Sequence, residues 1–498
     1  MPADTPIVPD AAPTTASEAS RFLSIFFSVA PAMFLGSIDQ TIVATALPAI
    51  AAQLGSLANI AWVVTAYLLA ATIAAPIYGR LGDAISRKTA LLGALAFFLA
   101  GSLGCALSPD LLTLVIARSV QGLGGGGLMT LSQALIGEAV SPKERGKFQG
   151  WFAAVFATAS TLGPVLGGLL SEHAGWRWIF WINVPLGLAA VGAALRVKAE
   201  AGAGGFSLDL RGTALFIAST LALLVALSLG TAVGWASPSI LALLFTGLAG
   251  LALVLPVERR VSTPLLSPGL IAQPVVWRAA LCVLLFAASL FGGLIQVPLL
   301  LEMAFRVGSS NAGLLLIPLT LAQVVVSTWA GMHMSSTGLP RGPLIWGLAV
   351  ATAGFATLAV VLSYGPAAIV AASVLFGLGL GTTMPAAQTL AQWAGGKARL
   401  GASTATMSFS RSVGGVVGTA ITAAILLAAI EHYTPGSSAR VQALLRGSES
   451  GTGPALSRTV VIAAFRWVFA ALAILTLVAT LLAFSIPAVD LREPEPSP

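Results

Sequence analysis

The sequence has 498 residues, of which 57% are apolar and only 9% are charged, and its net charge is +7. Soluble domains carry about 25% charged residues, so this composition excludes an ordinary soluble protein. The basic residues are scattered through the loops and form no nucleic-acid-binding face. We therefore expect the lipid bilayer, and no nucleic acid, as a partner of this chain.

Hydropathy and helix breakers predict an all-α polytopic membrane protein with fourteen spans. A helix of about 20 apolar residues is long enough to cross the ~30 Å hydrocarbon core of a bilayer. In chain order the spans are expected at 22–50, 59–79, 88–107, 111–137, 147–171, 179–196, 211–230, 237–256, 278–302, 311–333, 342–363, 367–390, 403–430 and 460–486.

The spans divide into two six-helix bundles with two helices inserted between them. The expected segments are a disordered cytoplasmic tail at 1–20, a first bundle at 21–200, the inserted helices at 201–260, a second bundle at 261–487 with an external loop at 431–459, and a cytoplasmic tail at 488–498. An internal repeat supports this division, because Gly79–Lys88 and Gly331–Arg341 both begin with glycine and end with basic residues. Repeated halves are a common transporter plan, with the binding site between them near the membrane midplane.

The lysines and arginines predict the orientation of the chain. Of the 25 basic residues, 17 lie in the tails and loops of one side, 5 lie in the loops of the other, and the remaining three lie inside spans. Because loops rich in Lys and Arg stay in the cytoplasm, both termini are expected on the cytoplasmic side of the inner (plasma) membrane.

Two charges deep in apolar spans are the strongest functional candidates. Asp39 is the only acid clearly deep in a predicted span, and Arg118 stands in the apolar run 111–136 just before Gln121 and a group of glycines. A charge in the hydrocarbon core is costly unless it faces a partner or water. The first and fourth spans run in opposite directions, so both charges fall in the outer half of the membrane and can pair. A carboxyl whose neighbours change between two conformations can bind and release a proton, and the alternative is a fixed ion pair.

The predicted loop after the second span carries Gly79, Asp83, Arg87 and Lys88. An acid at this place can cap the N-terminus of a neighbouring helix and pair with cations. We expect these residues to form a conformational latch on the cytoplasmic side, and the alternative is a solvated charged turn.

The fifth span carries Gly163, Pro164, Gly167 and Gly168. Small residues at 159, 163 and 167 share one helix face, and a proline inside a helix bends it. Such a helix suits close packing at a gate, although ordinary packing glycines give the same pattern.

Taken together, these motifs resemble the major facilitator superfamily, in its fourteen-span drug:proton antiporter branch. The resemblance covers nearly the whole chain and is specific over residues 36–187. It rests on Asp39-Gln-Thr-Ile-Val with Ala46-Leu-Pro48, Trp62 with Tyr67-Leu-Leu, the Gly79–Lys88 loop, Arg118 with Gln121-Gly122, Gly163-Pro164 with Gly167-Gly168, and the segment Trp176–Pro185. It implies the major facilitator fold, alternating access and proton-driven export, and it assigns proton coupling to Asp39 and Arg118 and an antiporter motif to Gly163–Gly168.

Three positions depart from the family pattern. Ala84 stands where a basic residue is usual, Ser86 stands where a glycine is usual, and Ser335 occupies the acid position of the second-half copy. These departures predict a weaker latch that depends mainly on the first half.

Polar residues in other spans are candidates for the substrate cavity, namely Gln121, Gln296, Gln323, Gln388 and Arg411. Glu302 is either a vestibule group or an ordinary solvated helix end. Asp39 is nearly the only acid in the spans, whereas Arg118 and Arg411 are both basic. We therefore expect the transporter to prefer neutral or anionic amphiphiles as substrates, or to carry one cation per set of protons.

The sequence therefore predicts a proton-coupled multidrug efflux transporter, acting as a monomer on amphipathic small molecules. An enzyme is not expected, because His173, His333 and His432 have no catalytic or metal-binding cluster around them, and no cofactor is implied beyond the coupling proton. No phosphate-binding loop for ATP is present either. The alternatives are a dedicated exporter of one solute, such as a siderophore, lipid precursor or amino-acid derivative, and a non-transporting sensor or scaffold.

Overall fold

The computed structural model describes residues 15–54, 60–145, 149–198, 209–261, 264–436 and 457–493. These residues are almost entirely helical and contain no strand. Fourteen of the helices in this part of the chain are long and apolar enough to cross a membrane, which confirms the predicted fourteen-span fold. The predictions for 1–14, 437–456 and 494–498 lie outside the described residues.

The first half of the chain supplies six spans, and its last span is divided into two short helices. The bounds are α1 (Thr15–Leu54), α2 (Trp62–Ala84), α3 (Arg87–Leu107), α4 (Leu111–Ala139), α5 (Pro142–Arg145), α6 (Gln149–His173), α7 (Trp178–Trp181) and α8 (Asn183–Leu195). The division at Ile182 has a local cause, because Pro185 has no N–H to donate to the carbonyl four residues earlier.

Two helices follow as an inserted hairpin, and the second half supplies six further spans. The hairpin is α9 (Leu210–Val233) and α10 (Pro238–Glu258). The remaining bounds are α11 (Pro268–Ile271), α12 (Pro274–Phe305), α13 (Ser309–Leu314), α14 (Ile317–Thr337), α15 (Arg341–Val361), η2 (Leu362–Tyr364), α16 (Pro366–Leu380), α17 (Thr383–Gly395), η3 (Lys397–Arg399), α18 (Leu400–Tyr433) and α20 (Arg458–Phe484).

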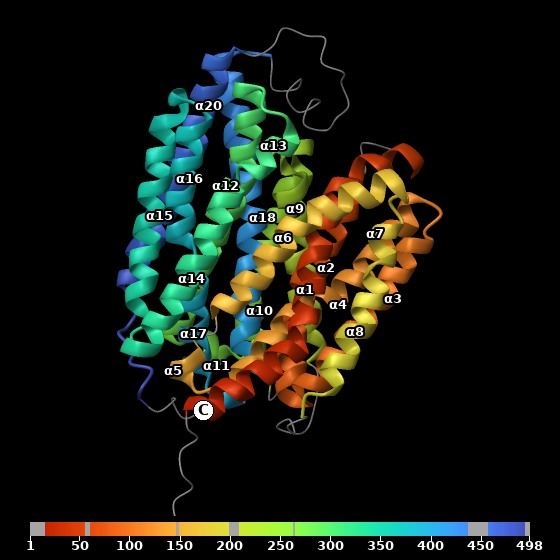
Figure 1. The fold of residues 1–498 in the computed structure, drawn as a ribbon, viewed down its shortest axis with the longest axis vertical. Coiled ribbons are helices and arrows are strands. Elements are labelled where there is room, and N and C mark those ends of the chain that lie inside the picture. The colour runs from red at the N-terminus through yellow and green to blue at the C-terminus, as the bar shows by residue number, and fades with distance from the viewer. Residues whose placement is uncertain are drawn as a thin grey trace, which may run out of the picture.

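Each half has an apolar core of its own. Residues between 22 and 197 form two buried clusters in the first half, and residues between 270 and 491 form one large cluster in the second. The rings of Phe355 and Phe376 stack in the second core with centroids 4.4 Å apart. In Figure 1 the helices of the two halves form two groups, with α9 and α10 between them.

The inserted hairpin packs across the seam between the halves. Leu224 of α9 contacts a small cluster that contains Leu69 of α2 and Val413 of α18. Helix α9 therefore touches a helix of each half, while α10 packs mainly on α9 and is otherwise largely unburied.

The predicted loop at 80–88 is mostly helical, which corrects the sequence-based boundary. Helix α2 continues to Ala84 and α3 begins at Arg87, so Gly79 and Asp83 lie in the last turns of α2. Charged residues without protein partners would remain in solvent, which is why the sequence pattern predicts a loop here. In the structure Asp83 is 8% exposed, because it is bound by Arg87 nearby and by backbone N–H groups from a distant part of the chain.

Candidate functional site

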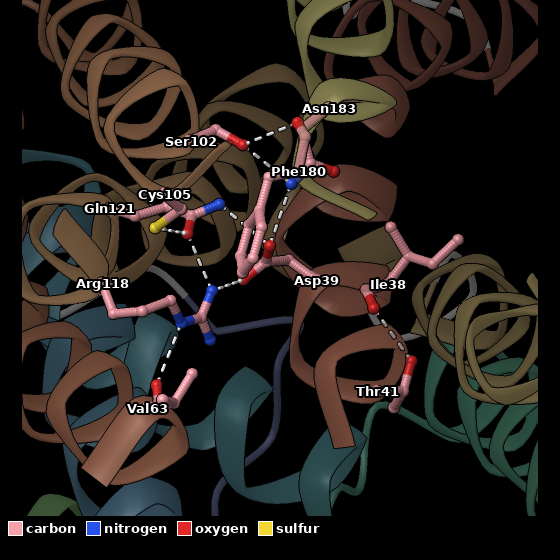
Figure 2. A network of polar contacts seen from close by, with 10 residues as sticks. All are labelled: Ile38, Asp39, Thr41, Val63, Ser102, Cys105, Arg118, Gln121, Phe180 and Asn183. Carbon is pink, nitrogen blue, oxygen red and sulfur yellow. Dashed lines mark hydrogen bonds and ion pairs between the residues drawn. The ribbon is translucent and has the colours of Figure 1, made fainter. Parts of the chain in front are cut away.

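Asp39 on α1 lies at the centre of a buried polar cluster in the first half (Figure 2). Its Oδ2 accepts a hydrogen bond from Arg118 Nη1 at 2.6 Å. Its Oδ1 accepts from Gln121 Nε2 and from Asn183 Nδ2, both at 2.9 Å. Asp39, Gln121 and Asn183 have no exposed surface, and Arg118 is 1% exposed. The structure thus brings the two predicted proton-coupling residues into one ion pair, away from lipid.

Arg118 also binds helix α2. Its Nε donates to the carbonyl of Val63 at 3.0 Å, and its guanidinium lies 4.2 Å from the ring centroid of Tyr67. Its Nη1 donates to Gln121 Oε1 at 2.7 Å as well as to Asp39. A planar guanidinium can serve these partners at once, which a lysine ammonium on its flexible stem cannot do. Asp39 on α1 is therefore connected to α2 through Arg118 on α4.

Two members of the cluster were not assigned a role from the sequence. Asn183 begins α8, and its Nδ2 also lies 3.1 Å from Ser102 Oγ on α3. Ser102 in turn donates to the Phe180 carbonyl at 3.0 Å. The signal in the sequence that could have identified Asn183 is its position as a single asparagine in an apolar span, two residues before Pro185. The cluster thus holds α1, α2, α3, α4 and the α7–α8 span together around one carboxylate.

A cavity lies between the two halves beside this cluster. It is lined by Gly36, Ser37, Gln40, Ala71, Ala75, Gly125, Gly126, Met129, Thr130, Phe156, Ser408, Arg411 and Ser412. Asp39 does not line it, although its neighbours on α1 do. A Cβ added at Gly125 would lie 2.2 Å from the Tyr67 hydroxyl, so the Tyr67 side chain contacts both a residue of the cavity wall and Arg118. In this conformation Asp39 and Arg118 are buried and neither lines the cavity.

Of the predicted cavity residues, only Arg411 lines this cavity. Gln121 belongs to the Asp39 cluster, and Gln388 is fully buried with its Nε2 3.0 Å from Thr404 Oγ1. Gln296 is 3% exposed and Gln323 is half-buried, and neither reaches the cavity wall. A glutamine in an apolar span predicts a buried polar contact, but the rotation of its helix decides which neighbours it meets. Glu302, near the end of α12, is half-buried.

Asp83, in the last turn of α2, joins the two halves where α2 ends and α18 begins. Its two carboxylate oxygens accept from the backbone N–H groups of Gly401 and Ala402, each at 2.9 Å, at the N-terminus of α18. Arg87 Nη2 lies 2.7 Å from Asp83, and Arg87 Nη1 lies 2.7 Å from Glu138. An anion at a helix N-terminus is stabilised by the free N–H groups and the helix dipole.

The other predicted latch residues divide into two groups. Gly79 allows α2 and α18 to approach each other closely, because a Cβ there would lie 2.6 Å from the Gly401 carbonyl oxygen. Lys88 does not take part in the contact between halves, since its Nζ donates to the Leu195 carbonyl of the first half at 2.8 Å. In the second-half copy, Ser335 Oγ donates to Glu144 Oε1 of α5 at 2.9 Å, a contact that the sequence did not predict.

Helix α6 presents glycines to α1, the helix that carries Asp39. A Cβ at Gly163 would lie 1.9 Å from Thr41 Oγ1, and one at Gly167 would lie 2.2 Å from Thr45 Oγ1. Gly168 faces open space, with nothing within 4 Å of the same position. Pro164 lies inside α6, and its side chain is outside the described part of the structure.

We expect Gly163→Val to slow transport about tenfold, because its methyl groups would overpack the α1–α6 contact by about 1–3 kcal/mol. Gly168→Val is the matched control, since that site has room. Export rates and thermal stabilities of the two purified variants measure the difference. Equal behaviour of both variants would show that the tight face of α6 has no special role.

Within the described residues, no group of three or more His, Cys, Asp or Glu side chains could hold a metal ion. His333 stacks on Trp329, and His173 Nδ1 lies 3.0 Å from the Leu169 carbonyl oxygen. These histidines are in ordinary structural contacts.

Comparison with known proteins gives a consistent result. The family description of the Major Facilitator Superfamily matches residues 29–209. The multidrug transporter protein MdtP of Bacillus subtilis (strain 168) is 32% identical over 399 residues, which cover 79% of this chain and 73% of MdtP. The MFS-type efflux pump MMF1 of Pseudozyma antarctica (strain T-34) is 33% identical over 413 residues, covering 80% of this chain and 76% of that protein.

A solved structure shares the fold. The crystal structure of the human organic anion transporter MFSD10 (TETRAN) superposes with a TM-score of 0.66 at 14% identity, covering 93% of this chain and 99% of that chain. At this identity the likeness concerns the fold alone. The sequence relatives, the fourteen apolar helices and the shared fold agree, and the chain belongs to the Major Facilitator Superfamily, as a multi-pass membrane transporter.

Proposed function

We propose that this protein is a multidrug efflux transporter that exchanges protons for amphipathic small molecules by alternating access across the plasma membrane. Export of several compounds is supported by the names of the relatives, which include a multidrug transporter and an efflux pump. Proton coupling is supported by one observation above all. A buried carboxylate, Asp39, is held by a single guanidinium whose other contacts reach a helix that spans the membrane.

The proposed coupling runs along α2. Protonation of Asp39 removes the negative charge that holds Arg118, and a buried charge without its partner is costly. Arg118 must then move, and because it binds Val63 and Tyr67, α2 must move with it. The other end of α2 carries Asp83, which caps α18 of the second half. A proton at one end of α2 thereby weakens the contact between the halves at the other.

The same geometry limits the access of the proton to Asp39 and of the substrate to the cavity in any one conformation. In the conformation described, Asp39 does not line the cavity, and the Asp83 contact holds the halves together at the end of the molecule where α2 ends and α18 begins. We assign that end to the cytoplasm from the distribution of basic residues. One chain supplies both walls of the cavity, so we take the monomer as the functional unit.

Proteoliposomes with an imposed pH gradient test this function. The purified protein should accumulate neutral, anionic or cationic amphiphiles against their gradients when a pH gradient is present, and a proton ionophore should abolish the accumulation. Uphill transport of several unrelated compounds would support multidrug export. Transport of one compound alone would favour a dedicated exporter, and transport that ignores the ionophore would overturn proton coupling.

A further inference from the structure

Arg411 is a cation well inside a membrane-spanning helix, and it lines the cavity. It is the twelfth residue of α18, which begins at Leu400, so it lies ~17 Å along the helix from that end. Its neighbours on the cavity wall include hydroxyl groups from both halves, Ser37 on α1 and Ser408 and Ser412 on α18. The amide of Gln40 adds a further polar group from α1.

This cation has no partner of its own within the described residues. Arg118 is paired with Asp39, and Arg466 is exposed and donates to Ser363 Oγ at 3.3 Å. Arg411, by contrast, makes no hydrogen bond or ion pair in the part of the chain that the structure describes. No Asp or Glu lines the cavity, and Asp39, which is not a lining residue, is already bound by three donors. A charged side chain at this depth is tolerated when it faces water or a counter-charge.

The remaining wall of the cavity is apolar. Met129 and Phe156 lie on the first-half side with Ala71 and Ala75, whereas the second half contributes only Arg411 and the two serines of the same helix, Ser408 and Ser412. The site thus offers one positive charge with hydroxyl groups around it and an apolar surface nearby. This is the complement of an amphiphile with one anionic end. A guanidinium can bind a carboxylate through two parallel hydrogen bonds, which fixes both position and orientation.

We propose that Arg411 binds the carboxylate of anionic, aromatic amphiphiles that the transporter exports, with Ser408 and Ser412 as neighbouring hydrogen-bond donors. This inference rests on the proposed export function and adds a substrate class to it. It has an energetic consequence, since outward movement of an anion and inward movement of a proton shift charge in the same direction. A negative potential inside the cell therefore drives export of a carboxylate more strongly than export of a neutral analogue at equal proton stoichiometry.

A matched pair of probes tests the proposal, namely dansylglycine, which carries a carboxylate, and dansylglycinamide, its neutral amide. Binding to the purified full-length protein is followed by dansyl fluorescence. Arg411→Gln should raise the Kd for dansylglycine at least tenfold and leave the Kd for dansylglycinamide within twofold. Arg411→Lys should recover much of the lost affinity because it keeps the charge. Arg466→Gln is the control, an exposed cation outside the cavity, and should change neither Kd.

The proposal is overturned if Arg411→Gln weakens both probes equally, if it weakens neither, or if the wild type does not bind the carboxylate. Transport separates this outcome from failure of the function itself. If the wild type exports neutral compounds under a pH gradient while Arg411→Gln shows no selective loss of dansylglycine, only the anion site is wrong. If the wild type exports nothing under a pH gradient, the export function is wrong, whatever the binding data show.

Discussion

Asp39→Asn is expected to abolish pH-driven export while exchange of substrate across the membrane without a pH gradient continues. Asparagine keeps the shape of the side chain but cannot take up a proton, so accumulation against a gradient should fall to the level of empty liposomes. Asp110→Asn is the matched control, because Asp110 is an exposed acid that caps α4 and should leave accumulation unchanged. The measurement is uptake in proteoliposomes, with and without an imposed gradient.

The substitution also has a structural effect that must be separated from coupling. The introduced amide would leave Arg118 buried without its anion, and removing one partner of a buried pair costs about 3–5 kcal/mol. The double variant Asp39→Asn, Arg118→Gln removes both charges and should regain much of the lost thermal stability, yet it should remain uncoupled. If either variant still accumulates substrate when a pH gradient is applied, Asp39 is not the proton carrier.

Asp83→Asn is expected to open the contact between the two halves where α2 ends and α18 begins. The charged oxygens of Asp83 bind two backbone N–H groups of α18, and hydrogen bonds to a charged group contribute about 1.5–3 kcal/mol. Loss of the charge should therefore shift the equilibrium toward the open conformation by about ten- to a hundredfold. Spin labels at Leu195 and Leu339, exposed positions on the two halves, should show a larger population at long distance.

A matched acid provides the control for this prediction. Asp209 also accepts from two backbone N–H groups, those of Arg211 and Gly212, but it caps α9, its own helix. Asp209→Asn should leave the distance distribution between the labels unchanged. If Asp83→Asn gives the same distribution as the wild type, the contact does not set the balance between conformations.

The sequence predicted well those parts of the site where an unpaired charge in an apolar span would carry a large free-energy cost. An aspartate and an arginine in apolar spans each need a partner, and their matched depths left few alternatives. The fold followed from the same reasoning, because a run of about 20 apolar residues has one stable structure in a bilayer. The spans of the structure accordingly begin and end near the predicted residues in most cases.

The parts that the sequence did not predict depend on partners far away along the chain. Asp83 is buried because it caps a helix that begins more than 300 residues later, as its contact with Gly401 shows. Gln121 and Gln388 were assigned to the cavity, but the rotation of their helices turns them into buried contacts. Tyr67 lies against Gly125 of the cavity wall and against Arg118, and no local pattern encodes this pair of contacts.

The most direct test measures protons released when substrate binds to the purified protein in weakly buffered solution, followed with a pH-sensitive dye. If Asp39 exchanges its proton for substrate, the wild type should release protons in proportion to bound substrate, and Asp39→Asn should bind substrate without releasing any. Equal proton release from the wild type and from Asp39→Asn would contradict the central role of this carboxyl.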